Sequence, residues 1–292
     1  MTLDQLRIFV GVAEREHVTA AARALNVTQS AASAAIATLE ERHAIKLFHR
    51  VGRGITLTEA GHAFLGEARG VLARAAAAEQ VLAEFGDLAR GSLRVVASQT
   101  IAAYWLPPIL AEFHGRYPGL SVDLAIGNTE QAAARVRDGT ADLGIVEGEV
   151  DDPALAHWRL GEDRLVLVAS EPPTAAINAD WLRGARWVMR ELGSGTRSTL
   201  NAAMRAVGVD PDALDVTLVL PSNESVRTAV ESGAGVTALS ALVVAPALAA
   251  GSLYAVPVDL GVRPFYGLRH KERYRTKAAD ALLELIVGQS TD

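Results

Sequence analysis

The sequence predicts an α/β protein with a helical N-terminal part, and three observations support this. Apolar side chains recur at helical spacing through the first ninety residues, whereas strand and helix patterns alternate from Gly91 onward. The length of 292 residues suits two domains of roughly 100–200 residues each. Half of the residues are apolar and 21% are charged, a composition that excludes a disordered chain.

Three helices are expected before residue 45. Thr19 is expected to cap a short second helix over residues 20–25, Asn26-Val27 to form a tight turn, and Thr28 to cap the third helix. Apolar positions at helical spacing mark the first and third helices: Leu3, Leu6, Phe9, Val10 and Ala13, then Ala32, Ile36 and Leu39. A short helix, a tight turn and a longer helix form a helix-turn-helix, which places its second helix in the DNA major groove.

The start of the third helix carries the candidate DNA contacts Thr28, Gln29, Ser30 and Ser33. Glutamine reads adenine through two hydrogen bonds, and serine reads a base or holds a phosphate. Residues 47–49 and 54–57 are expected to form a wing of two short strands, whose Arg50 and Arg53 meet the sugar-phosphate backbone. The alternative is an alanine-rich packing unit in which the polar residues are only helix caps.

A long helix is expected from Thr58. Two apolar positions repeat every seven residues along it: Phe64, Val71, Ala78 and Phe85, and beside them Ala68, Ala75 and Leu82. Interleaved heptads of this kind favour a coiled-coil seam between two chains. A single helix packed on its own domain is the alternative. From Thr58 to Ala89 the helix would span about 48 Å.

Residues 91–292 are predicted to form the α/β domain. Strands are expected at 93–97, 120–126, 141–146, 164–169, 186–190, 216–220, 235–238, 253–258 and 265–268. Helices are expected at 105–117, 130–138, 198–207, 222–232 and 276–287. Strands that alternate with helices are typical of a parallel sheet.

Two hydroxyl-rich turns in this domain follow strands and open helices. Ser98-Gln99-Thr100 follows the first strand, and Gly193–Arg197 follows the strand at 186–190. A glycine-rich turn at a helix N-terminus exposes N–H groups that bind anions, and Arg190 or Arg197 would supply charge. The candidate ligand-binding residues are Ser98, Thr100, Glu147, Ser194, Gly195, Thr196 and Arg197. Glu147 beside an anion would require a protonated ligand, a cationic part or a neutralising arginine. Plain turns and helix caps are the alternative.

Composition and motifs exclude several function classes. The chain has no cysteine, hence no disulfide, cysteine zinc site or thiol nucleophile. It also has no nucleotide-binding loop, hydrolase elbow or zinc-protease motif, so we expect no enzyme and no metal. Residues 232–258 carry no charge and are numerous enough to span a bilayer, but glycines and prolines cut them into short elements. The net charge is −6, yet residues 1–57 carry seven Lys/Arg against five Asp/Glu, as DNA contact requires.

A set of N-terminal segments occurs in one order over about sixty residues: Phe9-Val10, Thr19–Leu25, Val27–Ser33, Ile36, Leu39-Glu40, Leu47–Arg50 and Leu57–Gly61. These segments closely resemble the signature of LysR-type transcriptional regulators. The resemblance implies that residues 1–57 form a winged helix-turn-helix DNA-binding domain and that residues 58–90 form a linker helix for dimerisation. The family usually has glycine just before the wing, as a left-handed helix exit; this chain departs from the pattern with His43-Ala44.

The C-terminal pattern is similar to the co-inducer-binding region of this family, and so to type 2 periplasmic solute-binding proteins. The resemblance implies two α/β lobes with a cleft between them, one from about 91–167 and 266–292 and one from about 168–265. Ala97–Ile101 and Arg190–Arg197 look like the regulators of sulfur assimilation and of carbon-fixation operons, with Leu192 where relatives often have proline. That subgroup implies a small oxyanion such as sulfite or sulfate, or a phosphorylated metabolite.

These observations predict a LysR-type regulator, cytoplasmic because its first residues lack the pattern of a signal peptide. Its expected partners are double-stranded promoter DNA, a small anionic effector, further copies of the chain in a homodimer and homotetramer, and RNA polymerase. No cofactor and no membrane are expected. The alternative is a small-molecule binding protein or enzyme whose helical N-terminal segment only dimerises it.

Overall fold

The computed structural model describes residues 1–52, 54–84, 91–148, 150–174 and 176–289. The chain divides into two compact units, an N-terminal unit formed mainly by residues up to 84 and a C-terminal unit formed mainly by residues from 91 onward. Each unit has its own apolar clusters, and each is described by itself.

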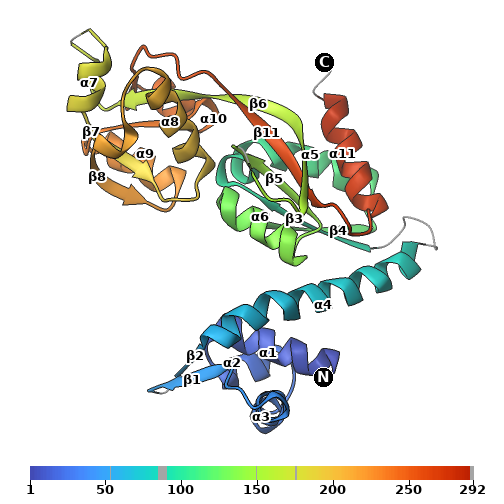
Figure 1. Cartoon of the computed structure of the whole chain (residues 1–292). Helices are drawn as coiled ribbons and strands as arrows, with labels where there is room; N and C mark the ends of the chain where they lie inside the picture. Colours follow the sequence, from blue (N-terminus) through green and yellow to red (C-terminus); the bar gives the residue numbers. More distant parts are fainter. Residues whose placement is uncertain (53, 85–90, 149, 175, 290–292) are drawn as a thin grey trace. The chain divides into compact units, whose positions relative to one another are not determined.

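The N-terminal unit is a winged helix-turn-helix followed by a long helix, as predicted (Figure 1). Its elements are α1 (Leu3–Arg15), α2 (Val18–Ala24), α3 (Gln29–His43), β1 (Phe48–Val51), β2 (Gly54–Leu57) and α4 (Glu59–Glu84). Strands β1 and β2 pair antiparallel and form the wing. The buried ring of Phe9 in α1 contacts Phe48 of the wing and Phe64 of α4, with ring centroids 5.4 and 4.8 Å apart.

The caps of the short helices differ in part from the expectation. Thr28 caps α3 as predicted, since its Oγ1 accepts a hydrogen bond from the Ala31 N–H at 3.1 Å. The predicted cap of α2 at Thr19 is wrong. The Nδ1 atom of His17 accepts the Ala20 N–H at 3.3 Å, and α2 begins at Val18. A neutral imidazole nitrogen accepts a hydrogen bond, so histidine can fill a cap position usually occupied by a hydroxyl or an amide.

Ala44 ends α3 in the left-handed region, with φ 51° and ψ 36°. The N–H groups of Ala44 and Ile45 bond to Glu41 O and Glu40 O at 3.3 and 3.1 Å. The chain therefore leaves α3 by the left-handed turn that a glycine would provide, although an L side chain is strained there.

Helix α4 begins at the predicted place, because Thr58 Oγ1 accepts the Gly61 N–H at 2.9 Å and caps its first turn. Its 26 residues correspond to about 39 Å. Ala68 is buried in the apolar core of the N-terminal unit, whereas Val71 is 43% and Leu82 is 75% exposed. The last predicted heptad residue, Phe85, and the predicted helix end at Ala89 lie outside the described residues.

The C-terminal unit is built on a mixed sheet with the strand order β4-β3-β5-β11-β6-β9-β7-β8, and β10 also pairs with β6. The strands are β3 (Gly91–Ala97), β4 (Leu120–Ile126), β5 (Leu143–Glu147), β6 (Leu155–Ala169), β7 (Arg186–Arg190), β8 (Asp215–Leu220), β9 (Val236–Ser240), β10 (Tyr254–Ala255) and β11 (Val262–His270). Strands β4-β3-β5 belong to the first lobe and β9-β7-β8 to the second. Strand β6 pairs with β11 along its first part and with β9 along its second part, and so runs through both lobes (Figure 1).

The prediction of a parallel sheet is correct within each lobe and wrong in the middle. Strands β3, β4 and β5 pair in parallel, as do β7, β8 and β9. Strands β6 and β11 pair antiparallel with each other. Strand β6 also pairs antiparallel with β9, and β11 pairs antiparallel with β5. The first part of β6 was missed because Arg159, Glu162 and Asp163 interrupt its apolar run, although its residues alternate between buried and exposed.

Helices cover both lobes: α5 (Leu106–Arg116), α6 (Thr129–Asp138), α7 (Ala179–Gly184), α8 (Gly195–Ala206), α9 (Asn223–Glu231), α10 (Ala241–Ala250) and α11 (Lys277–Gln289). Sequence reading assigned no helix to α7 or α10. Phe113 of α5 and Leu282 of α11 are fully buried in the first lobe, and Trp187 and Met204 are fully buried in the second. Among the described residues, no helix combines the length and the hydropathy needed to cross a membrane.

The exit from α3 generates a stability prediction. Ala44→Gly is expected to raise the free energy of unfolding of the N-terminal unit by about 1 kcal/mol, because a side chain in the left-handed region costs roughly 1–2 kcal/mol. The measurement is urea denaturation followed by far-UV circular dichroism. Tryptophan fluorescence follows the C-terminal unit separately, since Trp105, Trp158, Trp181 and Trp187 are the four tryptophans of the chain.

The matched control is Ala34→Gly, at an exposed position in the middle of α3. This change is expected to lower the same free energy by about 1 kcal/mol, as glycine does inside a helix. Equal destabilisation by both substitutions would contradict the assignment of strain to Ala44.

Candidate functional site

The start of α3 and the wing form one concave surface in the N-terminal unit. A pocket of about 190 Å³ is lined by His17, Val18, Thr19, Gln29, Ser33, Arg50, Gly52, Gly54 and Ile55. The structure therefore brings Gln29, Ser33 and Arg50 together, although about twenty residues separate the helix from the wing. Arg53 lies outside the described residues.

The predicted contact residues at the start of α3 are accessible to solvent. Thr28, Gln29, Ser30 and Ser33 are exposed, as is Arg50. The hydroxyl groups of Thr28 and Ser30 lie 3.0 Å apart. Exposed hydroxyl, amide and guanidinium groups at a helix start and a wing are suited to base edges and phosphates.

Glu40 fixes the wing to α3. Its Oε1 accepts the backbone N–H groups of Leu47 and Phe48 at 2.9 and 3.3 Å, and its Oε2 lies 2.6 Å from Lys46 Nζ. Burial alone would raise the pKa of Glu40, but the hydrogen bonds from Lys46, Leu47 and Phe48 outweigh burial and hold the pKa below its ordinary value. Sequence reasoning gave Glu40 no role; its only signal was a glutamate beside the buried Leu39.

Three of the predicted ligand residues of the C-terminal unit meet around a buried arginine. Arg263 of β11 is fully buried, and its Nη1 donates to Thr196 Oγ1 at 3.0 Å and to Glu147 Oε1 at 3.3 Å. Ser98 Oγ donates to the other carboxylate oxygen of Glu147. The Nη2 atom of Arg263 lies 2.6 Å from Asp163 Oδ2. We call these five residues, Ser98, Glu147, Asp163, Thr196 and Arg263, the buried cluster.

Gly195 brings the start of α8 against the end of β5. A Cβ atom at Gly195 would overlap the carbonyl oxygen of Glu147 and approach Glu147 Cγ to 2.8 Å. The same carbonyl oxygen accepts a hydrogen bond from Thr129 Oγ1 at 2.7 Å. Glycine is therefore required at Gly195 by close approach of the two lobes, in addition to any role in presenting N–H groups.

Thr100 lies in a second contact between the lobes. Its Oγ1 accepts a hydrogen bond from Asn223 Nδ2 at 3.0 Å, and Asn223 Oδ1 accepts Arg190 Nη1 at 2.5 Å. Arg190 also donates from Nε and Nη2 to the two carboxylate oxygens of Glu191, both at 2.8 Å. Burial would raise the pKa of Glu191, but the hydrogen bonds and charge of Arg190 hold it below its ordinary value.

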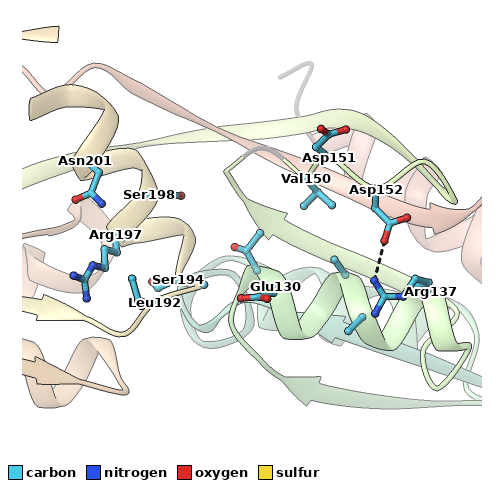
Figure 2. A pocket seen from close by; sticks show the side chains of 14 residues that line it. Glu130, Arg137, Val150, Asp151, Asp152, Leu192, Ser194, Arg197, Ser198 and Asn201 are labelled. Carbon is cyan, nitrogen blue, oxygen red and sulfur yellow. Dashed lines mark hydrogen bonds and ion pairs between the residues drawn. The ribbon is translucent and has the colours of Figure 1, made fainter. Parts of the chain in front are cut away.

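A pocket of about 430 Å³ opens between α6 and α8. Figure 2 shows Ser194, Arg197, Ser198 and Asn201 on the second lobe and Glu130, Arg137 and Val150–Asp152 on the first. Of the two candidate arginines, Arg197 lines this pocket, whereas Arg190 is paired with Glu191. Arg137 is paired with Asp152 at 3.2 Å.

The walls of the pocket differ in charge. The second-lobe wall holds Arg197 and the start of α8, where Ser194 makes no side-chain cap; the N–H groups and the helix dipole there attract negative charge. The first-lobe wall holds Glu130, Asp151 and Asp152. On the second-lobe wall, two buried atoms, Arg197 Nε and Asn201 Oδ1, have no hydrogen-bond partner among the described residues. The pocket can therefore hold an anionic group at α8.

Sequence reasoning missed the residues that connect the two lobes, Asp163, Asn223 and Arg263. Their signal was weak: Arg263 and Asp163 are charged residues within or next to apolar strands, and Glu147 alone called for a neutralising arginine. Within the part of the chain that the structure describes, no cluster of three or more acidic or histidine side chains could hold a metal ion.

Comparison with known proteins gave two family matches. Residues 3–62 match the model described as "Bacterial regulatory helix-turn-helix protein, lysR family". Residues 86–290 match the model described as "LysR substrate binding domain". Together the two models cover both units of the chain.

Individual proteins are also similar to this chain. The uncharacterized HTH-type transcriptional regulator YeiE of Escherichia coli is 30% identical over 97% of this chain and 96% of its own length. The HTH-type transcriptional regulator CysL of Bacillus subtilis is 33% identical over 82% of this chain and 81% of its own. The structure of the Synechocystis CcmR regulatory domain in complex with 2-PG matches with a TM-score of 0.63 and 26% identity, covering 70% of this chain and 99% of that one.

The position of Glu40 generates a pH-dependent prediction. Glu40→Gln is expected to lower the free energy of unfolding of the N-terminal unit by about 1.5–3 kcal/mol at pH 7, because hydrogen bonds to a charged acceptor are lost. The folded pKa lies below the ordinary value of 4.5. The stabilisation is therefore complete above about pH 4.5 and disappears as the pH falls through the folded pKa. Urea denaturation of the wild type and the variant from pH 7 to pH 3 measures this.

Glu41→Gln is the matched control, since Glu41 is the exposed neighbour on the same helix. It is expected to change the free energy by less than about 0.5 kcal/mol. A difference between Glu40→Gln and the wild type that stayed constant down to pH 3 would rule out the charged form of Glu40 as the anchor of the wing.

Proposed function

Because the chain belongs to the LysR family of bacterial transcriptional regulators, we propose that α3 and the wing read promoter DNA and that a small anionic effector in the C-terminal unit modulates this binding. The family is not enzymatic. The match of residues 3–62 to the helix-turn-helix model of this family argues against the alternative in which the N-terminal helices serve only for dimerisation.

The proposed DNA contacts rest on one observation, the common pocket that Gln29 and Ser33 share with Arg50. Gln29 and Ser33 lie where a recognition helix meets base edges, and Gln29 suits adenine. Thr28, Ser30, Arg50 and Arg53 are assigned to phosphates, which fix the register of the protein on the duplex. The basic balance of residues 1–57 supports this assignment.

We assign α4 to dimerisation. Its outward positions include Val71 and Leu82, which are 43% and 75% exposed, and these belong to the two heptad series read from the sequence. Exposed apolar residues that belong to two interleaved heptad series favour a partner helix. A dimer of helix-turn-helix units reads two related half-sites, so the operator is expected to be partly palindromic. A homotetramer of two such dimers and contact with RNA polymerase extend this proposal.

The effector site is assigned to the pocket between α6 and α8 together with the adjoining buried cluster. Arg197 and the uncapped start of α8 favour an anion there. The structure of the CcmR regulatory domain in complex with 2-PG supports a small anionic ligand of the oxyanion or phosphorylated class. Such a ligand acts only through different affinities for two arrangements of the oligomer.

The DNA-reading residues can be tested by substitution. Gln29→Ala combined with Ser33→Ala is expected to weaken binding to the adjacent promoter by about 10–100-fold, as the loss of a base contact does. Arg50→Ala is expected to lower the slope of log affinity against log salt by about one, as the loss of a phosphate contact does. DNase footprinting and titrations at several salt concentrations measure both effects.

Thr38→Ala is the control, on the exposed surface of the same helix but one and a half turns further on. It is expected to leave affinity unchanged. Absence of any footprint with the wild type, or full affinity in the double variant, would refute the proposed DNA contacts.

The effector site can be tested without knowing the natural ligand. Sulfate, sulfite, inorganic phosphate and 2-PG are screened by thermal unfolding, with tryptophan fluorescence as the signal. Arg197→Gln is expected to weaken the binding of the responding anion by about tenfold, through loss of a charged hydrogen bond, and to leave promoter binding intact.

Arg205→Gln provides the matched control, because Arg205 lies on the exposed last turn of the same helix. Equal loss in both arginine variants would show that general charge, rather than the start of α8, attracts the anion.

A further inference from the structure

The carboxylate of Glu147 is surrounded by groups that bind anions. Ser98 donates its hydroxyl to one carboxylate oxygen, and Arg263 donates to the other at 3.3 Å. The start of α8 is in contact with the same side chain, because a Cβ at Gly195 would lie 2.8 Å from Glu147 Cγ. A hydroxyl, a guanidinium and a helix N-terminus are the three features from which the sequence predicts an anion site, and here they enclose a side chain of the protein.

Glu147 is almost completely buried, at 2% exposure, and Arg263 is fully buried. Arg263 also faces Asp163, so one arginine serves two buried carboxylates. The Nε atom of Arg263 has no hydrogen-bond partner among the described residues. Buried charges need close partners, and the buried cluster already contains more negative than positive groups. A further anion therefore fits beside Arg263 only if a carboxylate leaves.

The buried cluster is adjacent to the pocket between α6 and α8. Thr129 lines that pocket and donates its hydroxyl to the backbone carbonyl of Glu147 at 2.7 Å. Ser194, which also lines the pocket, immediately precedes Gly195 at the start of α8. A ligand that contacts Thr129 or Ser194 in the pocket is thus separated from Glu147 by a single residue.

We propose that Glu147 is a built-in ligand: its carboxylate occupies the innermost anion position between the two lobes, and an anionic effector competes with it for Ser98 and Arg263. This inference rests on the proposed effector function and specifies its regulation. Arg263 also donates to Thr196 of the second lobe, so the competition alters a hydrogen bond between the lobes. The ligand class is a small carboxylate or oxyanion.

A purely structural role of Glu147, as counterion of Arg263, makes a different prediction. In that case removal of the carboxylate destabilises the protein, and no small anion restores the loss. In a built-in ligand site, removal of the side chain leaves a vacancy that an anion of the same chemistry fills. The distinction can therefore be measured as rescue by acetate or sulfate.

The test compares the wild type with Glu147→Ala in the full-length protein. Thermal unfolding is followed by tryptophan fluorescence in sodium acetate or sodium sulfate, against sodium chloride at the same ionic strength. Glu147→Ala is expected to be stabilised by acetate and sulfate with an apparent dissociation constant at least about tenfold lower than that of the wild type. Adding Arg263→Met to Glu147→Ala is expected to abolish this gain.

Glu171→Ala is the matched control, because it removes one negative charge from an exposed residue of the same unit that belongs neither to the buried cluster nor to the lining of the pocket between α6 and α8. It is expected to respond to anions like the wild type. Glu147→Gln, which keeps the shape of the side chain, provides a second variant should the alanine variant fail to fold, and sulfate is expected to bind it about tenfold more tightly than the wild type.

Equal anion affinity in the wild type and in the folded Glu147 variants overturns the proposal. A gain in anion affinity in Glu171→Ala equal to that in Glu147→Ala overturns it as well. Promoter footprinting on the same samples separates this result from the proposed function. If the wild type binds the promoter and responds to an anion, but the Glu147 variants show no gain in anion affinity, the proposed effector function stands. Only the proposal that Glu147 is a built-in ligand then fails.

Discussion

The arrangement of the C-terminal unit depends on the buried Arg263. Its guanidinium group donates to Glu147 at the end of β5, to Thr196 in the first turn of α8 and to Asp163 on β6. These partners belong to the first lobe, the second lobe and a strand that runs through both. A buried carboxylate without its partner is strongly destabilising, so this one side chain determines which approach of the two lobes is tolerated, and Gly195 supplies the room for it.

A buried carboxylate has a comparable part in the N-terminal unit, where Glu40 holds Lys46, Leu47 and Phe48 and so fixes the wing relative to α3. The two carboxylates differ in environment. Glu40 accepts hydrogen bonds from two backbone N–H groups and from a solvent-exposed lysine, and therefore holds only the adjoining segment of the chain in place. Glu147 faces an arginine that it shares with another acid, next to the pocket to which we assign the effector. The arrangement at Glu40 is suited to a rigid wing, whereas the arrangement at Glu147 is suited to exchange of this carboxylate for an anionic ligand.

Much of this could be predicted from the sequence, because helical and strand periodicity is strong in α1, α3, α4 and in the parallel strands of each lobe. The turns at Ser98 and Gly193–Arg197 were also found, since glycine and hydroxyl residues after a strand have a clear chemical meaning. Only parts of β6 and β11 were predicted, at 164–169 and 265–268, and their antiparallel pairing was not foreseen, because charged residues that pair with each other across the fold resemble an exposed loop in the sequence. Arg263 and Asp163 gain their meaning only from that pairing. The cap at His17 depends likewise on a tautomer, which a sequence does not specify.

The course of β6 and β11 has a consequence for synthesis on the ribosome. The first lobe combines the strands at 91–147 with α11 at the chain end, and Leu282 of α11 is fully buried in its core. The second lobe, by contrast, is a continuous stretch between β6 and β11. A continuous segment can fold while translation proceeds, whereas a lobe made from distant segments must wait for the last of them. Arg263 lies in β11, after all the strands of the second lobe, so the buried cluster is completed only after that lobe has been synthesised. The connection between the two lobes therefore forms later than the second lobe itself.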